Sequence, residues 1–194
     1  MEQVDGKCRT AIAMMIALML SALVTPVHGA SVANKRMLDG KHWTLANLAV
    51  KTASSYCYED ADSNCEKYGR LYTWDSAQKA CRALGRGWRL PSDEEWRQLA
   101  KRYGGVSEDS EDKGKAAFAA LLSGGGSGFN AVLGGGRSVD SKYARGEAHG
   151  FYWTSSESNP AGAFYYNFGK GGQALHRQDG GEKDRSFSVR CVRD

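Results

Sequence analysis

The residues of this chain best suited to chemistry are its cysteines, of which there are five among 194 residues. A cysteine can act as a nucleophile, ligate a metal or form a disulfide, and the redox state of its compartment largely decides which. Cys8 stands near the N-terminus, whereas Cys57, Cys65, Cys81 and Cys191 lie in the body of the chain. The chemistry of these four therefore depends on whether the chain leaves the cytoplasm.

An apolar segment near the N-terminus predicts export. Residues 11–24, AIAMMIALMLSALV, are uncharged, and Lys7 and Arg9 precede them. A membrane-spanning helix needs about 20 apolar residues, so this shorter run is typical of the core of a signal peptide. Small residues follow it, and we expect cleavage after Gly29.

Two features of this segment leave alternatives open. Ala30 or Ala33 would also suit the enzyme that removes the signal peptide. Glu2 and Asp5 make the region before the apolar run less basic than usual, so an uncleaved membrane anchor is a second possibility. The absence of a cysteine directly after the apolar run argues against a lipoprotein.

The length and composition of the remaining chain predict one domain. We assign residues 1–29 to the signal peptide and residues 30–194 to a single domain, located in the periplasm, at the cell surface or outside the cell, with no membrane span in the mature chain. The net charge of +4 is small and its basic residues are scattered. Nucleic acid is therefore not an expected partner.

In an exported chain, four cysteines predict two disulfides. Three connectivities are possible. Cys57 and Cys65 flank a short polar segment that could close on itself, which leaves Cys81 to pair with Cys191. The longer bridge would close a loop of about 110 residues and contribute roughly 4–5 kcal/mol in the chain-entropy model.

Other candidate catalytic groups do not form a recognisable motif. The body of the chain has three histidines, His42, His149 and His176, and it has no H-E-x-x-H or G-x-S-x-G sequence. The acidic run at residues 93–95 suits the first turn of a helix better than general acid–base catalysis. The sequence therefore predicts no catalytic residue and no cofactor.

The segment between Cys57 and Cys65 carries acidic residues that could ligate calcium. Glu59, Asp60 and Asp62 alternate there, but the twelve-residue pattern of a calcium-binding loop is absent. We favour a solvated disulfide loop and predict no metal ligands, with calcium dependence as the alternative.

Two amphipathic helices are predicted in the first half. Thr73 is a good N-cap, and apolar residues then recur at spacings of three and four up to Leu84. Ser92 and Glu95 form a capping box for the second helix, which ends before Gly104. A short buried helix is expected at residues 116–122, followed by a glycine-rich stretch of irregular loops at 123–138.

The C-terminal third predicts an antiparallel β-meander. Four strand candidates alternate with glycine-rich turns; they lie at residues 151–156, 163–168, 173–177 and 186–192. The turns fall at residues 169–172 and 179–181. Helices followed by a sheet define an α+β domain.

Several motifs together resemble a known family. These are SYCYED and NCEKYGRLYTW, GWRLPSDEEW, GSGFNAVLGGGRS, FYWTSSE and the terminal FSVRCV. They are similar to the Fibrobacter succinogenes major paralogous domain over residues 41–193. The resemblance implies a C-type-lectin-like fold, shared with formylglycine-generating enzyme and retroelement variable proteins. In such folds a helix cysteine bridges to the last strand, which agrees with Cys81 and Cys191.

The same resemblance points to the C-terminal region as a ligand-binding face, because that region binds ligand in the retroelement variable proteins. Tyrosine and arginine are common anchors of binding surfaces. The candidate ligand-binding residues are Tyr165, Tyr166, Phe168, Gln173, His176, Arg177 and Asp179. The alternative is that strand alternation sends half of these side chains into the core.

We therefore expect an exported, non-catalytic binding or adhesion module that recognises a protein or glycan ligand. Two alternatives remain. One is an exported enzyme similar to formylglycine-generating enzyme, which would need a free cysteine of low pKa. The other is a structural subunit of an envelope assembly.

Overall fold

The computed structural model describes residue 1 and residues 32–194. The predicted signal peptide therefore lies outside the described residues except for Met1. All four α-helices of the described chain precede residue 122; they are α1 (Asp62–Tyr68), α2 (Trp74–Arg82), α3 (Asp93–Lys101) and α4 (Lys115–Leu121). A 3-10 turn, η1 (Tyr58–Asp60), comes directly before α1.

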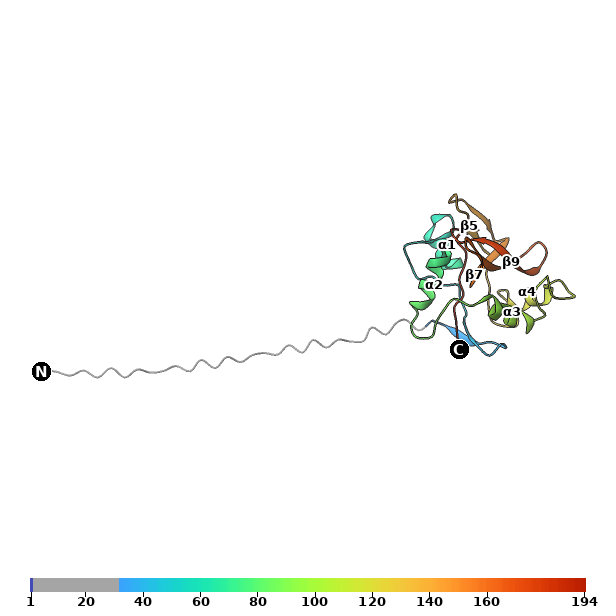
Figure 1. Cartoon of the computed structure of the whole chain (residues 1–194), viewed down its shortest axis with the longest axis horizontal. Coiled ribbons are helices and arrows are strands. Elements are labelled where there is room, and N and C mark those ends of the chain that lie inside the picture. Colours follow the sequence, from blue (N-terminus) through green and yellow to red (C-terminus); the bar gives the residue numbers. More distant parts are fainter. Residues whose placement is uncertain (2–31) are drawn as a thin grey trace.

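The strands form three sheets, and the largest occupies the C-terminal third (Figure 1). The short strands are β1 (Asn34–Arg36), β2 (His42–Thr44), β3 (Ser55–Tyr56), β4 (Leu71–Tyr72) and β10 (Val192–Arg193). The large sheet has the order β6-β5-β7-β8-β9; its strands are β5 (Gly134–Arg137), β6 (Tyr143–Gly146), β7 (His149–Asn159), β8 (Gly162–Gly169) and β9 (Ala174–Glu182). The predicted α+β class and the β7–β8–β9 meander are confirmed.

One predicted turn was wrong, because strand β9 continues through residues 179–181 to Glu182. Gly181 pairs with Ala163 on β8, and its Cα faces the Trp153 ring so closely that a Cβ would lie 2.6 Å from that ring. The glycine is therefore needed for close packing inside a strand rather than for reversing the chain. The chain turns after it, at residues 183–185.

The last predicted strand, residues 186–192, was also only partly correct. Ser186, Phe187 and Ser188 make isolated bridges to three different segments before the chain reaches β10. β10 then pairs with β2, so the two ends of the described domain lie in one small sheet. This segment is thus a buried connection between sheets and not a fourth strand of the meander.

The glycine-rich stretch was predicted to be irregular, but residues 134–137 form β5, which pairs with both β6 and β7. Gly136 lies against two aromatic rings, and a Cβ there would be 3.1 Å from both Phe151 and Phe187. Glycine therefore allows the strand to approach these rings.

The two long amphipathic helices are confirmed. Helix α3 begins with the complete capping box: the Glu95 amide donates to the Ser92 hydroxyl, and the Ser92 amide donates to the Glu95 carboxylate. Helix α1 was not predicted. The segment between Cys57 and Cys65, expected to be a plain polar loop, contains η1 and the first half of α1.

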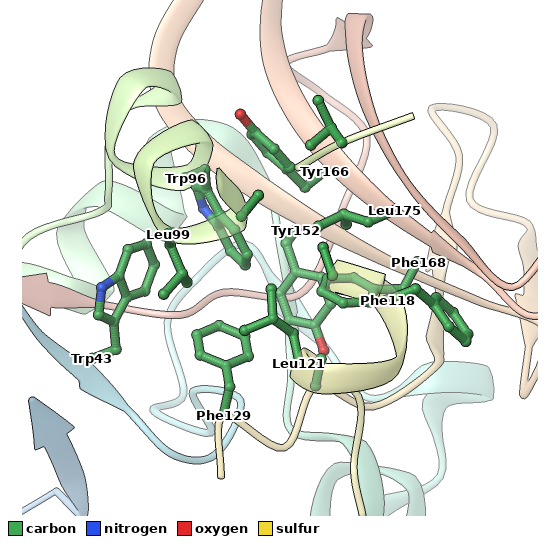
Figure 2. Packing of buried hydrophobic residues seen from close by; sticks show 14 of the residues in the cluster. Trp43, Trp96, Leu99, Phe118, Leu121, Phe129, Tyr152, Tyr166, Phe168 and Leu175 are labelled. Carbon is green, nitrogen blue, oxygen red and sulfur yellow. The ribbon is translucent and has the colours of Figure 1, made fainter. Parts of the chain in front are cut away.

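Two hydrophobic cores cover opposite faces of the large sheet. Helices α3 and α4 pack on one face, where Trp96 stacks on Tyr166 at a centroid distance of 5.0 Å (Figure 2). Helix α2 packs on the other, where Trp153 lies 4.5 Å from Phe187. The five tryptophans are all buried; they are Trp43, Trp74, Trp88, Trp96 and Trp153.

Both predicted disulfides are present. Cys81 on α2 bridges to Cys191, and the sequence separation of these two cysteines is 110. Cys191 directly precedes β10. Both of these cysteines are fully buried. The second bridge joins Cys57, before η1, to Cys65 in α1. The helix-to-last-strand bridge that the family resemblance implies is therefore confirmed.

Candidate ligand-binding site

The structure divides the predicted binding residues between the core and the surface. Tyr166 and Phe168 are fully buried, Tyr166 against Trp96 and Phe168 against Phe118 at 6.2 Å. Assigning these two to a binding surface was wrong, because alternate residues of β8 face the helices. Tyr165, on the opposite face of the same strand, is only partly buried.

Arg177 is occupied by an internal ion pair. Its guanidinium donates to both oxygens of Asp93, with Nε 2.8 Å from Oδ1 and Nη2 2.8 Å from Oδ2. It also lies over the Phe164 ring at 4.1 Å. The hydrogen bonds to Asp93 raise the pKa of Arg177. This arginine therefore ties β9 to the start of α3 and is not available as a ligand anchor in this arrangement.

The other predicted residues of β9 do not form one surface with Tyr165. His176 Nδ1 lies 3.4 Å from Glu108, whose carboxylate also accepts the Arg177 amide. Gln173 is exposed in the turn before β9, with a φ of +49°. Asp179 is exposed farther along the strand. The residues predicted from the sequence are thus spread over β8, β9 and the turn between them, and they do not line a common hollow.

Tyr165 instead lines a hollow of about 240 Å³ on the α2 side of the large sheet, which we call the arginine hollow. It is formed by Gly136, Arg137, Ser138, Ala144, Arg145, Phe151, Tyr165, Arg185 and Phe187. These residues come from β5, β6, β7, β8 and the segment after β9.

Three aromatic rings make the floor of the arginine hollow. Phe187 lies 4.9 Å from Tyr165 and 5.1 Å from Phe151, and Phe151 lies 6.1 Å from Tyr165. Phe151 also stacks on His149 at 5.5 Å. Since the rings pack against one another and against the second core, the floor is rigid.

Three arginines surround this floor, and two of them have no carboxylate partner in the described chain. Arg137 and Arg145 form no ion pair with residues 32–194, whereas Arg185 Nε lies 2.8 Å from Glu182. Arg137 lies over the Tyr56 ring at 4.0 Å, and its Nε is buried without a hydrogen-bond partner. A buried donor of this kind costs free energy unless something accepts its hydrogen.

The β5–β6 hairpin positions two of these arginines, Arg137 and Arg145. Arg137 ends β5 and pairs with Tyr143 on β6, while Arg145 has a φ of +67° in the left-handed region. Such a conformation is uncommon for a residue other than glycine. Tyr143 donates to Asp60 at 2.6 Å, so the hairpin is held by η1.

The phenol of Tyr165 adds a polar group at the floor. Burial raises its pKa; the charge of Arg185 acts in the opposite direction, and that of Asp179 raises it further. Tyr165 therefore keeps its proton at neutral pH and can donate a hydrogen bond.

This arrangement is suited to binding an acidic group beside an apolar one. Guanidinium groups bind carboxylate, sulfate and phosphate oxygens with paired hydrogen bonds, and aromatic faces supply apolar contact. Sequence reasoning missed Arg137, Arg145 and Arg185, because only the folded chain brings them together. The sole sequence signal was Tyr165, in a strand rich in aromatic residues.

The described residues contain no cluster of three or more histidine, cysteine or acidic side chains placed to hold a metal ion. Within residues 32–194, no helix has the length and apolar character needed to cross a membrane. All four cysteines in this range are disulfide-bonded.

The fold and site together define an α+β domain stapled by two disulfides, with an arginine-lined hollow on its sheet. The chain belongs to the Fibrobacter succinogenes major domain family, whose model matches residues 28–193. This match begins earlier than the resemblance over residues 41–193 that the motifs indicate. No curated protein and no solved structure has significant similarity to the chain.

Proposed function

We propose that this chain is an exported, non-catalytic binding module that holds an acidic group of a glycan or protein ligand in the arginine hollow. The observation that supports the proposal best is that a packed aromatic floor lies beside two arginines, Arg137 and Arg145, that have no carboxylate partner among residues 32–194. A surface arginine is normally solvated by water. Guanidinium groups gathered around apolar rings therefore suit a ligand that carries an acidic group beside an apolar one.

Two other features support export and the absence of catalysis. Structural disulfides form in oxidising compartments outside the cytoplasm, and the described chain has two. The apolar segment at residues 11–24 fits a signal peptide. An enzyme similar to formylglycine-generating enzyme would need a free cysteine of low pKa, and each described cysteine is in a bridge.

An array of acidic and neutral glycans and of acidic peptides, probed with the mature domain, tests the proposal. Binding should favour acidic members and weaken as salt rises from about 0.05 to 0.5 M, because salt screens exposed charges. For the best-bound member, Arg145→Gln should weaken binding about fivefold or more, the lower limit of a significant interface contact.

Arg102→Gln is the matched control, because Arg102 is an exposed arginine at the end of α3. It should bind like the unmodified protein. Equal binding of neutral and acidic members, or equal losses in the Arg145 and Arg102 variants, would overturn the assignment of the hollow.

A further inference from the structure

The two disulfides of this domain have very different surroundings. Cys81 and Cys191 are fully buried between α2 and the last strand. Cys65 is partly exposed and lines a surface hollow of about 310 Å³, together with residues 45–47 and 66–69 among others. A dissolved thiol can therefore approach the Cys57–Cys65 bridge at Cys65, whereas its partner Cys57 is buried.

A cation lies against both sulfur atoms of this exposed bridge. Arg70 Nη1 is 3.4 Å from Cys57 Sγ and 3.3 Å from Cys65 Sγ. The guanidinium is held there by Ser55, whose hydroxyl accepts from Nε at 2.9 Å and whose carbonyl accepts from Nη2 at 2.6 Å. Arg70 forms no ion pair with any other described residue, so its charge is directed at the sulfurs.

Adjacent cations lower the pKa of a cysteine and stabilise the thiolate that leaves when a disulfide is attacked. One acidic group acts in the opposite direction, because Asp62 Oδ1 lies 3.7 Å from Cys57 Sγ. Arg70 is closer and contacts both sulfurs, so its effect should dominate.

We propose that the Cys57–Cys65 disulfide is a thiol–disulfide exchange site that a dithiol reduces, with Arg70 stabilising the thiolates. A thiolate of the dithiol attacks Cys65 Sγ, and the bond to Cys57 breaks, releasing Cys57 as a thiolate. The second thiolate of the donor then attacks the donor sulfur of the mixed disulfide and releases Cys65. Two electrons pass to the bridge, and the donor leaves as a disulfide.

The bridge also constrains a backbone conformation that supports the arginine hollow. Glu59 and Asp60, inside the loop that it closes, have φ values of +54° and +55°, which residues other than glycine rarely adopt. Tyr58 and Asp60 contact β6: the Gly146 amide donates to the Tyr58 hydroxyl at 3.2 Å, and Tyr143 donates to Asp60. Reduction of the bridge therefore loosens the β5–β6 hairpin.

Differential alkylation of the folded mature protein tests the exchange site and needs no ligand. After exposure to limiting dithiothreitol, free thiols are blocked, and the remaining disulfides are reduced and labelled with a second reagent for mass spectrometry. Cys57 and Cys65 should be reduced at least about 100-fold faster than Cys81 and Cys191. Reduction of both bridges at one rate would overturn the proposal.

Variants of Arg70 separate its charge from its structural role. Arg70→Met should slow reduction of the Cys57–Cys65 bridge about tenfold or more, and Arg70→Lys should retain most of the rate. Arg102→Met, which removes an exposed arginine at the end of α3, away from the bridge, is the control and should leave the rate unchanged. A rate in Arg70→Met equal to that of the unmodified protein, or an equal loss in Arg102→Met, would contradict the role of the Arg70 charge.

A measurement on the unmodified protein covers the case in which Arg70→Met does not fold. In the selectively reduced protein, thiolate absorbance at 240 nm should titrate below the ordinary cysteine pKa of about 8.5. A midpoint at or above that value would refute the proposal. Amide hydrogen exchange in β6 should also become faster when the Cys57–Cys65 bridge is reduced. An unchanged exchange rate would show that the bridge does not stabilise the β5–β6 hairpin.

Discussion

Glu95 offers a quantitative test of how the start of α3 is stabilised. Its carboxylate accepts from both terminal nitrogens of Arg89, at 2.6 and 2.7 Å, and from the Ser92 amide at 2.9 Å. Lys41 Nζ is 3.3 Å away. Burial alone would raise the pKa of Glu95, but these hydrogen bonds outweigh burial and lower it from 4.5 to about 2.

A lowering of this size corresponds to about 3 kcal/mol of stability at neutral pH. The Arg89 side chain is 40% exposed, and solvent screening reduces the expected value to about 2 kcal/mol. Because the unfolded chain binds this proton more tightly than the folded one, the contribution is complete above about pH 4.5 and is lost as pH falls through 4.5 to about 2.

The test compares the free energy of unfolding of the unmodified protein with that of Glu95→Gln. Both are unfolded in urea at several pH values, with tryptophan fluorescence as the readout. The difference in free energy of unfolding should be about 2 kcal/mol at pH 7, with less than half remaining at pH 3. Glu94→Gln, an exposed neighbour that hydrogen-bonds only to Gln98, should change stability by under about 0.5 kcal/mol. A Glu95 difference that is constant with pH, or below that of Glu94, would refute this explanation.

Three further predictions concern stability and are measured by thermal or urea unfolding. Replacing Cys81 and Cys191 together by serine should cost about 4–5 kcal/mol, since the bridge closes a loop of about 110 residues; a loss below about 1 kcal/mol would show that it does not staple the fold. Arg190→Met should cost at least about 3 kcal/mol, because the fully buried guanidinium donates to Asn47 and to three backbone carbonyls, which would be left unsatisfied; stability within 1 kcal/mol of the unmodified protein would contradict this accounting. Tyr166→Phe should cost about 1 kcal/mol for the lost hydrogen bonds to Asp93, whereas Tyr166→Ala should cost about 3–5 kcal/mol by leaving a core cavity; a well-folded alanine variant of normal stability would place Tyr166 outside the core.

Local sequence rules predicted helices α2, α3 and α4 and the two disulfides. The Ser92–Glu95 capping box depends on residues three apart, and helix α3 starts where it predicts. The pairing of Cys81 with Cys191 needed only an even cysteine count and one short candidate loop. These two features can be predicted from the sequence because one depends on residues close together in the chain and the other on a covalent bond between cysteines.

The errors arose where distant packing determines the role of a residue. No residue near Gly181 in the sequence reveals that this glycine lies against Trp153, so residues 179–181 were predicted to form a turn. The face toward which Tyr166 points is set by the β8 register, which shifts between Ala163 and Tyr165. A one-residue difference in register exchanges the two faces of a strand.

The candidate site could not be predicted for the same reason. Arg185 lies far from Arg137 and Arg145 in the chain, and Arg137 follows glycines that indicate a loop when read locally. Arg177 had the residue type expected of an anchor, yet Asp93 neutralises it in the fold. Residue type alone therefore does not distinguish a charge that is free to bind from one that is already paired.

The small β1–β2–β10 sheet has a consequence for how the domain is displayed. It brings the first described strand and the last strand together at one end of the molecule, while the β5–β6 hairpin lies at the opposite end (Figure 1). A tether attached to either flank therefore leaves the hairpin wall of the arginine hollow facing outward. A sensor surface that captures the protein through its C-terminus should consequently present the hollow to dissolved ligands without obstruction.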